Sequence, residues 1–183
     1  MKNKETVGTR FGKGLMNNSE CAIFYDSDAF SMSTKRLMGR NSAGASFLAG
    51  YFRYGSPESF WVYARTKNEA QGFADKAVKF RQDAKVKFIP YENFAALAEV
   101  QNIFYPSPDL IRLAWQRHQF GDKAWSICGI THTTASDTIM DAVGNYYTTP
   151  LRNWDALICT SQAVKKNIEN IIEAKKEFLR STL

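Results

Sequence analysis

The sequence has few of the residues that cross-link a small fold through disulfide bonds or bind a metal ion. It contains three cysteines and two histidines in 183 residues, and no two cysteines show Cys-x-x-Cys spacing. These counts exclude a disulfide framework and leave too few ligands for a zinc cluster. Because Cys21, Cys128 and Cys159 fall at or within apolar runs, we predict buried structural thiols in a reducing compartment.

Long apolar runs are also absent. No stretch of 18 apolar residues occurs, and the opening Met1 to Lys4 is not followed by the apolar segment of a secretory signal. Apolar residues make up 44% of the chain and charged residues 23%, which is the composition of a folded globular domain. We therefore expect a cytoplasmic protein in which residues 21–183 form one domain after a polar lead-in over residues 1–20.

Acidic residues are in the minority, because 18 Asp and Glu stand against 24 Lys and Arg, giving a net charge of +6. The excess is scattered, without a run of five basic residues, and basic and aromatic residues do not interleave on one element. This pattern argues against a nucleic-acid-binding module. It favours anionic partners such as nucleotides and phosphates, and it leaves room for peripheral contact with an anionic membrane surface.

Short apolar runs alternate with amphipathic segments along the chain. Runs of this kind, bounded by turn residues, are typical of buried strands. The alternation predicts an α/β fold, a three-layer Rossmann-like parallel sheet of about six strands with helices on both faces. The expected strands are 22–25, 60–63, 86–89, 102–105, 124–130 and 155–159. The expected helices begin near Ser42, at 68, 93 and 109, and near Ser136 and Ser161.

Ligands of open parallel sheets bind at the carboxyl ends of the strands, near the point where the strand order reverses. This rule directs attention to the polar residues that follow each predicted strand, before any motif is considered. They are Asp26, Asp28, Arg65, Thr66, Tyr91, Tyr105, Ser107, Thr131, His132, Thr133, Thr134, Thr160 and Ser161.

A glycine-bounded segment, Gly39 to Gly44, precedes the helix that Ser42 is expected to cap. Its glycine spacing is that of a phosphate-binding loop, but Ala45 stands at the position of the lysine. Without that cation the segment cannot hold the β- and γ-phosphates, which excludes an ATPase or GTPase. Two interpretations remain, an anion site of backbone N–H groups at a helix N-terminus and a plain strand-to-helix turn.

Asp26 and Asp28 have the D-x-D spacing that ends the first strand of haloacid-dehalogenase phosphatases. Paired carboxylates at this position can hold magnesium and supply a nucleophile. Thr66 could stand for that family's second motif, and Asp137 and Asp141 for its later acidic pair. The fit weakens at this pair, which does not follow the fifth strand directly and which a helix N-terminus also explains. A magnesium-dependent phosphatase therefore stays an alternative.

His132 falls just past the fifth predicted strand. An imidazole at that edge can donate a hydrogen bond to a sugar hydroxyl or stabilise developing charge. A structural histidine is the other interpretation. His118 stands beside Arg117 at a predicted helix end, where an exposed residue stabilised by the helix C-terminus is expected.

Three segments in order resemble the N-terminal domain of bacterial group 1, family 4-like glycosyltransferases. They are Leu37 to Leu48, Gly129 to Thr134, and Trp154 to Lys165. The third is the most specific, because Asp155 and Ser161 match the family's pattern D-x-[hydrophobic]-[hydrophobic]-x-x-S. The resemblance extends from about residue 21 to residue 172. These enzymes have the GT-B architecture, in which an acceptor-binding N-terminal domain faces a nucleotide-sugar-binding C-terminal domain.

The resemblance implies a glycosyltransferase that moves a sugar from a nucleotide-sugar donor to a glycan or a lipid-linked acceptor, with peripheral contact at the inner membrane. It implies no metal and no other cofactor. Only the N-terminal half is represented, and the donor-binding half would lie beyond Leu183. We then expect the surface that faces the missing half on the final helix. If the apolar stripe of that helix does not pack against the chain's own core, a homodimer is favoured. A non-catalytic nucleotide- or glycan-binding module is a further alternative.

The resemblance also assigns roles to single residues. His132 would be the catalytic residue beside the transferred sugar. The donor diphosphate would be approached by Gly39, Asn41, Ser42, Ala43 and Gly44. The acceptor would contact Asp26, Asp28, Arg65, Tyr105, Thr131 and Thr133.

Overall fold

The computed structural model describes residues 20–30, 39–55, 58–131 and 136–182. The strands are β1 (Ala22–Phe24), β2 (Phe60–Ala64), β3 (Val86–Pro90), β4 (Asn102–Tyr105), β5 (Ser126–Ile130) and β6 (Ala156–Ile158). The helices are α1 (Ser27–Phe30), α2 (Gly39–Tyr54), α3 (Lys67–Phe80), α4 (Phe94–Val100), α5 (Ile111–Phe120), α6 (Asp137–Gly144), the 3-10 helix η1 (Asn145–Thr148) and α7 (Gln162–Thr182).

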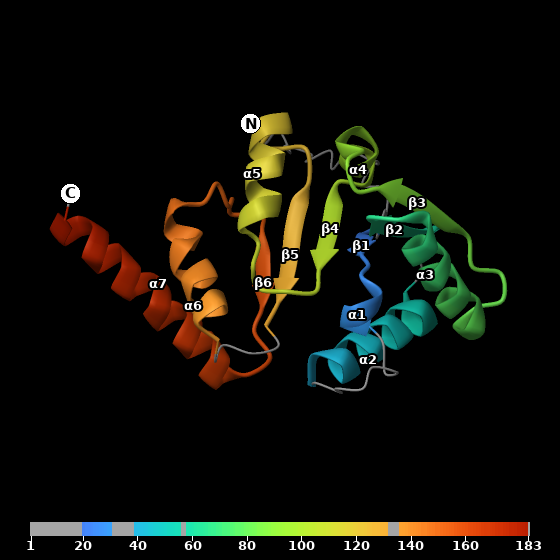
Figure 1. Cartoon of the computed structure of the whole chain (residues 1–183), viewed down its shortest axis with the longest axis horizontal. Coiled ribbons are helices and arrows are strands. Elements are labelled where there is room, and N and C mark those ends of the chain that lie inside the picture. Colours follow the sequence, from blue (N-terminus) through green and yellow to red (C-terminus); the bar gives the residue numbers. More distant parts are fainter. Residues whose placement is uncertain (1–19, 31–38, 56–57, 132–135, 183) are drawn as a thin grey trace, which may run out of the picture.

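The six strands form one parallel sheet in the order β3-β2-β1-β4-β5-β6 (Figure 1). The chain builds outward from β1 to β3, returns to the other side of β1 at β4, and builds outward again to β6. This is the strand order of a doubly wound Rossmann-like sheet, so the predicted fold class is confirmed. The sequence did not predict the short helix α1, and α2 begins at Gly39 rather than near Ser42.

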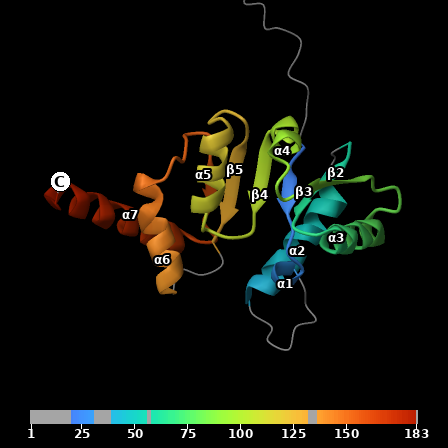
Figure 2. The same cartoon turned by 45° about the horizontal axis from the view of Figure 1, so that its top comes forward.

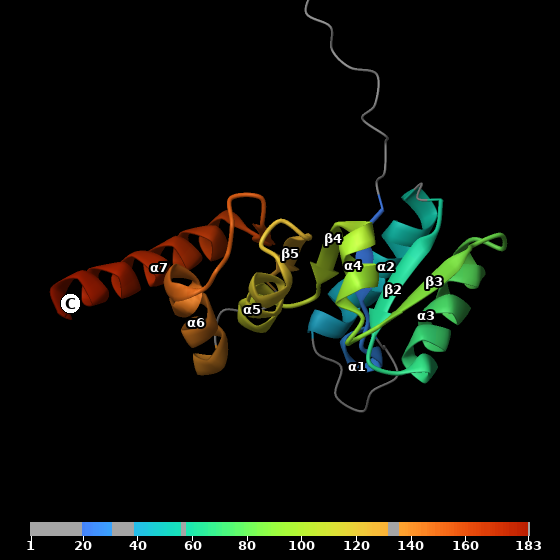
Figure 3. The same ribbon diagram turned by 90° about the horizontal axis from the view of Figure 1, so that it is seen from above.

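Helices cover both faces of the sheet because its central strands are apolar on both sides. All three residues of β1 are buried, and alternate side chains of a strand point to opposite faces. Phe24 packs in one core cluster with side chains of α4 and α5, including Leu97 and Leu113. Ile23 packs in the other cluster with side chains of α1, α2 and α3, including Phe52. Figure 3 shows the same layering from above.

Side-chain caps fix where several helices begin, because the first N–H groups of a helix have no partner within it. Thr66 and Glu69 form a complete capping box at the start of α3. Asn93 accepts a hydrogen bond from the Ala96 N–H at α4, at 3.1 Å. The predicted cap Ser136 is confirmed at α6.

The C-terminal helix α7 is largely exposed. Figure 2 shows α6 and α7 grouped at the β6 end of the molecule, with α7 extending beyond the sheet. Ile168 is the one buried residue of α7, whereas Phe178 is 58% exposed. The other apolar residues of the face expected to contact a partner are half-buried; they are Val164, Ile171, Ile172 and Leu179. Among the described helices, none is long and apolar enough to cross a bilayer.

Candidate functional site

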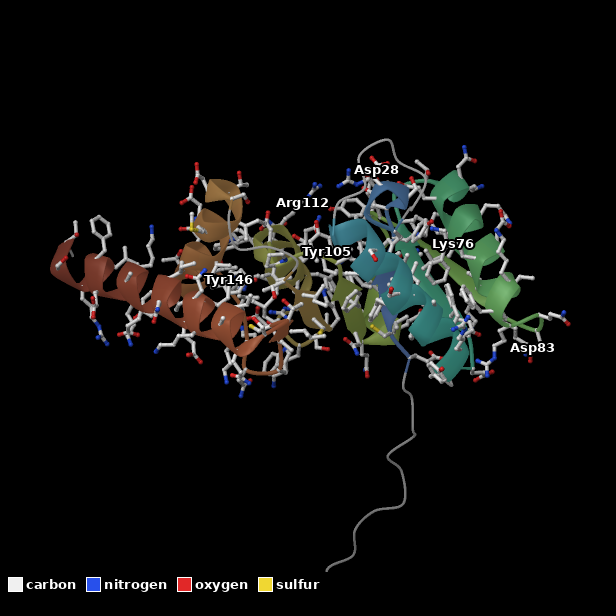
Figure 4. The ribbon with its side chains drawn as sticks, turned by 90° about the horizontal axis from the view of Figure 1, so that it is seen from below. Asp28, Lys76, Asp83, Tyr105, Arg112 and Tyr146 are labelled. Atoms are coloured by element: carbon white, nitrogen blue, oxygen red, sulfur yellow. The ribbon has the colours of Figure 1, made fainter. Side chains whose placement is uncertain are left out.

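The strand order reverses between β1 and β4, which are hydrogen-bonded neighbours. Helices leave these two strands toward opposite faces, and the carboxyl ends at such a reversal are where doubly wound proteins bind ligands. Figure 4 looks onto this edge of the sheet and labels Asp28, Tyr105 and Arg112 there. Some side chains at this edge gather around aromatic rings, and others form hydrogen bonds that stabilise strand ends and turns.

Tyr105, at the end of β4, is the centre of the first group. Burial raises the pKa of its phenol, and the charges of Asp109 and Asp26 act in the same direction. The guanidinium of Arg65 acts in the opposite direction on the same pKa. Two residues expected at the acceptor site also lie against the ring of Phe24 in β1, with the Arg65 Cζ atom 5.9 Å and the centre of the Tyr105 ring 4.9 Å from its centre. Asp26 follows the same strand, so all three expected residues stand at the ends of adjacent strands.

Asp26 has a second task in the turn that follows β1. Its Oδ1 accepts a hydrogen bond from the Asp28 N–H at 3.0 Å, and its carbonyl accepts one from the Ala29 N–H at 3.0 Å. Asp26 thus stabilises the start of α1, which places Asp28 on that helix with an exposed side chain. The two carboxylates, although only two residues apart in sequence, have different surroundings.

Two arginines lie over the ring of Tyr91, the residue that follows β3. The Cζ atom of Arg65 is 5.3 Å from the centre of this ring, and the Cζ atom of Arg112 is 5.1 Å from it. Arg112 comes from the first turn of α5, so its charge and the positive end of that helix lie on the same side. These side chains, with Pro90 and Glu92, line a hollow of about 460 Å³, which we call the arginine hollow.

The ring of Tyr91 is held firmly by its neighbours. Tyr63 stacks on it at a centroid distance of 5.2 Å, and the Tyr63 hydroxyl donates a 2.6 Å hydrogen bond to the Tyr91 carbonyl. Burial is the main cause of a raised pKa for Tyr63, which keeps this phenol protonated as a donor. Phe24 contacts Tyr91 edge-on at 5.9 Å. Both arginines therefore rest on a platform whose position is set by the core.

Several predicted edge residues are engaged in the fold instead. Thr131, expected at the acceptor, is fully buried, and its hydroxyl donates to the Ile158 carbonyl at 3.3 Å and accepts from the Thr160 N–H at 3.2 Å. The hydroxyl of Ser107 accepts from the Asp109 N–H at 3.1 Å, in the turn before α5. These hydroxyls tie strand ends and turns together, so their place at the carboxyl edge has a structural explanation.

Asp155 and Ser161, the two positions that carry the most specific sequence segment, also have structural partners. The two carboxylate oxygens of Asp155 accept hydrogen bonds from the two terminal nitrogens of the buried Arg117 guanidinium, at 2.5 Å and 2.7 Å. It also accepts the Ile127 N–H at 2.9 Å, which joins β6 to β5. Ser161 caps α7 by accepting the Val164 N–H at 3.2 Å.

The glycine-bounded segment does not form the predicted loop, and this expectation is corrected. Residues Gly39 to Gly44 are the first helical residues of α2. A Cβ atom at Gly44 would lie 2.5 Å from the Ala29 carbonyl oxygen and 3.0 Å from Cδ1 of Phe30. Glycine is therefore required at 44 because α1 packs directly against the backbone of α2. Ser42 and Ala43 are exposed on that helix, and the side chain of Asn41 lies outside the described residues.

His132 and Thr133 lie outside the described residues, so the proposed catalytic position has no described geometry. Of the residues that line the arginine hollow, only Arg65 carried a predicted role, and Tyr91 and Arg112 are the two others that the arrangement depends on. Tyr91 was found by the strand-end rule alone, because it directly follows β3. No sequence signal pointed to Arg112, since it lies inside α5 and only the tertiary structure brings its side chain to the Tyr91 ring.

The acidic residues of the phosphatase alternative are spread over the molecule. Asp137 and Asp141 lie on α6, which follows β5, and β5 is not a neighbour of β1. The Thr66 hydroxyl serves as the cap of α3. Within the described ranges, no group of three or more His, Cys, Asp or Glu side chains is arranged to hold a metal ion.

A scan against protein-family models finds no match, and searches of curated proteins and of solved structures find none either.

Proposed function

We propose that this chain is the acceptor-side domain of a nucleotide-sugar-dependent glycosyltransferase. The observation that carries the proposal is the position of Asp26, Arg65 and Tyr105 at the carboxyl ends of the adjacent strands β1, β2 and β4 in a Rossmann-like sheet. A carboxylate, a guanidinium and a phenol are the groups with which proteins hold hydroxylated ligands that also carry negative charge. The three sequence segments that resemble the glycosyltransferase family support the same conclusion.

In the proposed reaction, an acceptor hydroxyl attacks the anomeric carbon of the nucleotide sugar. The new glycosidic bond forms, the bond between that carbon and the diphosphate oxygen breaks, and the nucleoside diphosphate leaves with the electron pair. The acceptor proton passes to a base. In this scheme Asp26 and Tyr105 orient the acceptor hydroxyls, and His132 stabilises the charge that develops beside the transferred sugar.

The test is a transfer assay on the protein that joins this chain to its proposed donor half. We expect release of nucleoside diphosphate from one member of a nucleotide-sugar panel when an acceptor is added. His132→Ala should lower kcat by about a hundredfold or more while the thermal unfolding midpoint stays within a degree or two. Equal losses of turnover and stability would remove the catalytic role of His132.

The alternatives give different results with the same preparation. A phosphatase would hydrolyse p-nitrophenyl phosphate with magnesium and would lose this activity in Asp26→Asn, which would contradict the proposal. A non-catalytic module would bind ligands without turnover, even in the presence of every donor.

A further inference from the structure

We propose that the arginine hollow binds a phosphate monoester carried by a sugar or another polyol. The inference deepens the proposed function, because it names the chemical class of the acceptor. The phosphate would lie between Arg65 and Arg112, and the polyol would extend along the carboxyl edge toward Tyr105. Free sugar phosphates and phosphorylated lipid headgroups share this chemistry.

The first argument is the lack of an internal counter-ion. Among the described residues, no carboxylate lies within 4.0 Å of a nitrogen of Arg65 or Arg112, although six other ion pairs meet that criterion. Glu92 lines the same hollow without forming such a pair. Two guanidiniums gathered at one ring repel each other, and a bound anion would relieve that repulsion.

The second argument is the way in which the arginines are held. A guanidinium over an aromatic face keeps its N–H groups, which lie at its edge, available to an anion. The Tyr91 platform is fixed by Tyr63 and Phe24, so little side-chain entropy should be lost on binding. Both arginines are exposed, and their contact with this ring is what distinguishes them from arginines without a packing partner.

The third argument selects phosphate over carboxylate. One guanidinium fork already satisfies both oxygens of a carboxylate, whereas the three terminal oxygens of a phosphate monoester can accept hydrogen bonds from two forks. The doubly charged monoester also matches two cations. Glu92 also lines the hollow, where its carboxylate can accept hydrogen bonds from hydroxyl groups but repels further negative charge. This combination favours a phosphate attached to a hydroxylated body.

The experiment is isothermal titration of the chain with glucose 6-phosphate, with glucuronate and glucose as the carboxylate and neutral comparators. A parallel arm measures co-sedimentation with phosphatidylcholine vesicles that contain phosphatidic acid. We expect glucose 6-phosphate, or the phosphatidic acid vesicles, to bind about tenfold or more tightly than the comparators. Vesicles with phosphatidylglycerol, a diester, control for general attraction to a negative surface. Comparable binding of glucuronate, or no binding in either arm, would overturn the inference.

Variants locate the binding. Arg65→Gln and Arg112→Gln should each weaken glucose 6-phosphate binding by about tenfold or more. The matched control is Arg53→Gln. The Cζ atom of Arg53, on α2, lies 4.9 Å from the centre of the Phe80 ring, on α3. This substitution therefore removes the same charge and the same kind of contact at another place. An equal effect of all three substitutions would show a general charge effect and contradict the site.

Failure of this inference is separable from failure of the proposed function, because binding is measured without a donor. If the chain binds sugar phosphates but no transfer is found, the proposed phosphate site stands and the proposed glycosyltransferase function is contradicted. If the protein transfers sugar to an uncharged acceptor and Arg65→Gln does not change that transfer, the proposed glycosyltransferase function stands and the proposed phosphate site is overturned.

Discussion

At the scale of single residues, the buried ion pair of Arg117 and Asp155 connects the most parts of the fold. Arg117, on α5, is fully buried and also donates to the carbonyls of Pro150 and Trp125, each at 3.0 Å. Asp155 additionally accepts the Arg152 N–H at 2.7 Å. One pair therefore joins α5 to the start of β5 and to the turn before β6. Such a pair is costly to break because the remaining charge stays buried without its partner.

We predict that Arg117→Met and Asp155→Leu each lower the free energy of unfolding by about 3–5 kcal/mol. The double variant should lose at least about 1 kcal/mol less than the sum, because no unpaired charge remains in it. Urea denaturation followed by circular dichroism measures these values. Glu169→Ala is the control, since the exposed pair of Lys165 and Glu169 at 3.9 Å should contribute about 0.5 kcal/mol or less. Additive losses would contradict the coupling.

At the scale of elements, the packing of α1 against α2 determines how the chain leaves β1. The interhelical contact includes Gly44, and α1 presents the fully buried Phe30 to the core beneath it. Lys76 of α3 reaches the same place and donates to the Phe30 carbonyl at 2.9 Å. The end of the short helix is therefore held by two longer ones. This arrangement also positions Asp26 at the carboxyl edge, since it directly precedes α1.

Gly44→Ala should destabilise the protein by about 1–3 kcal/mol, because the new methyl group meets a backbone carbonyl that cannot move freely. Gly50→Ala on the same helix is the matched control. A Cβ atom there has no neighbour within 4 Å, and replacing a helical glycine should stabilise by about 0.5–1 kcal/mol. Opposite signs in urea denaturation would support close packing of α1 on α2, whereas stabilisation by both would contradict it.

At the scale of the whole molecule, the aromatic core makes the fold sensitive to alkaline pH. Burial raises the pKa of Tyr25 to about 12 and, with a contribution from Cys128, that of the Cys21 thiol to about 12. Burial likewise raises the pKa values of Tyr51, Tyr63, Tyr105 and Tyr146. The folded protein thus retains protons that the unfolded chain releases at lower pH.

The free energy of unfolding should therefore hold steady below pH 9 and fall as the pH rises toward 12. In this window the unfolded state binds fewer protons, so stability decreases with pH. Tyr25→Phe should reduce the slope measured by urea denaturation at a series of pH values. Tyr54→Phe is the control, because Tyr54 is 83% exposed. A slope of opposite sign would contradict the assignment of neutral buried phenols.

The sequence by itself determined the fold class and which polar residues gather at one edge. Period-2 and period-3.6 patterns are local, so six strands and their alternating helices could be found without knowing any contact. In a parallel sheet all carboxyl ends meet, so Asp26, Arg65, Tyr91 and Tyr105 could be named from their positions after strands. The caps at Ser136 and Ser161 followed from the same local logic.

The tertiary structure alone decided which of those residues line the arginine hollow and which form hydrogen bonds within the fold. The order β3-β2-β1-β4-β5-β6 brings Arg112 beside Tyr91, although about twenty residues separate them in the chain. It also buries Thr131 and directs Asp155 to Arg117. Periodicity cannot encode these outcomes, because they depend on which distant strands pair and on the close approach of backbones such as that at Gly44.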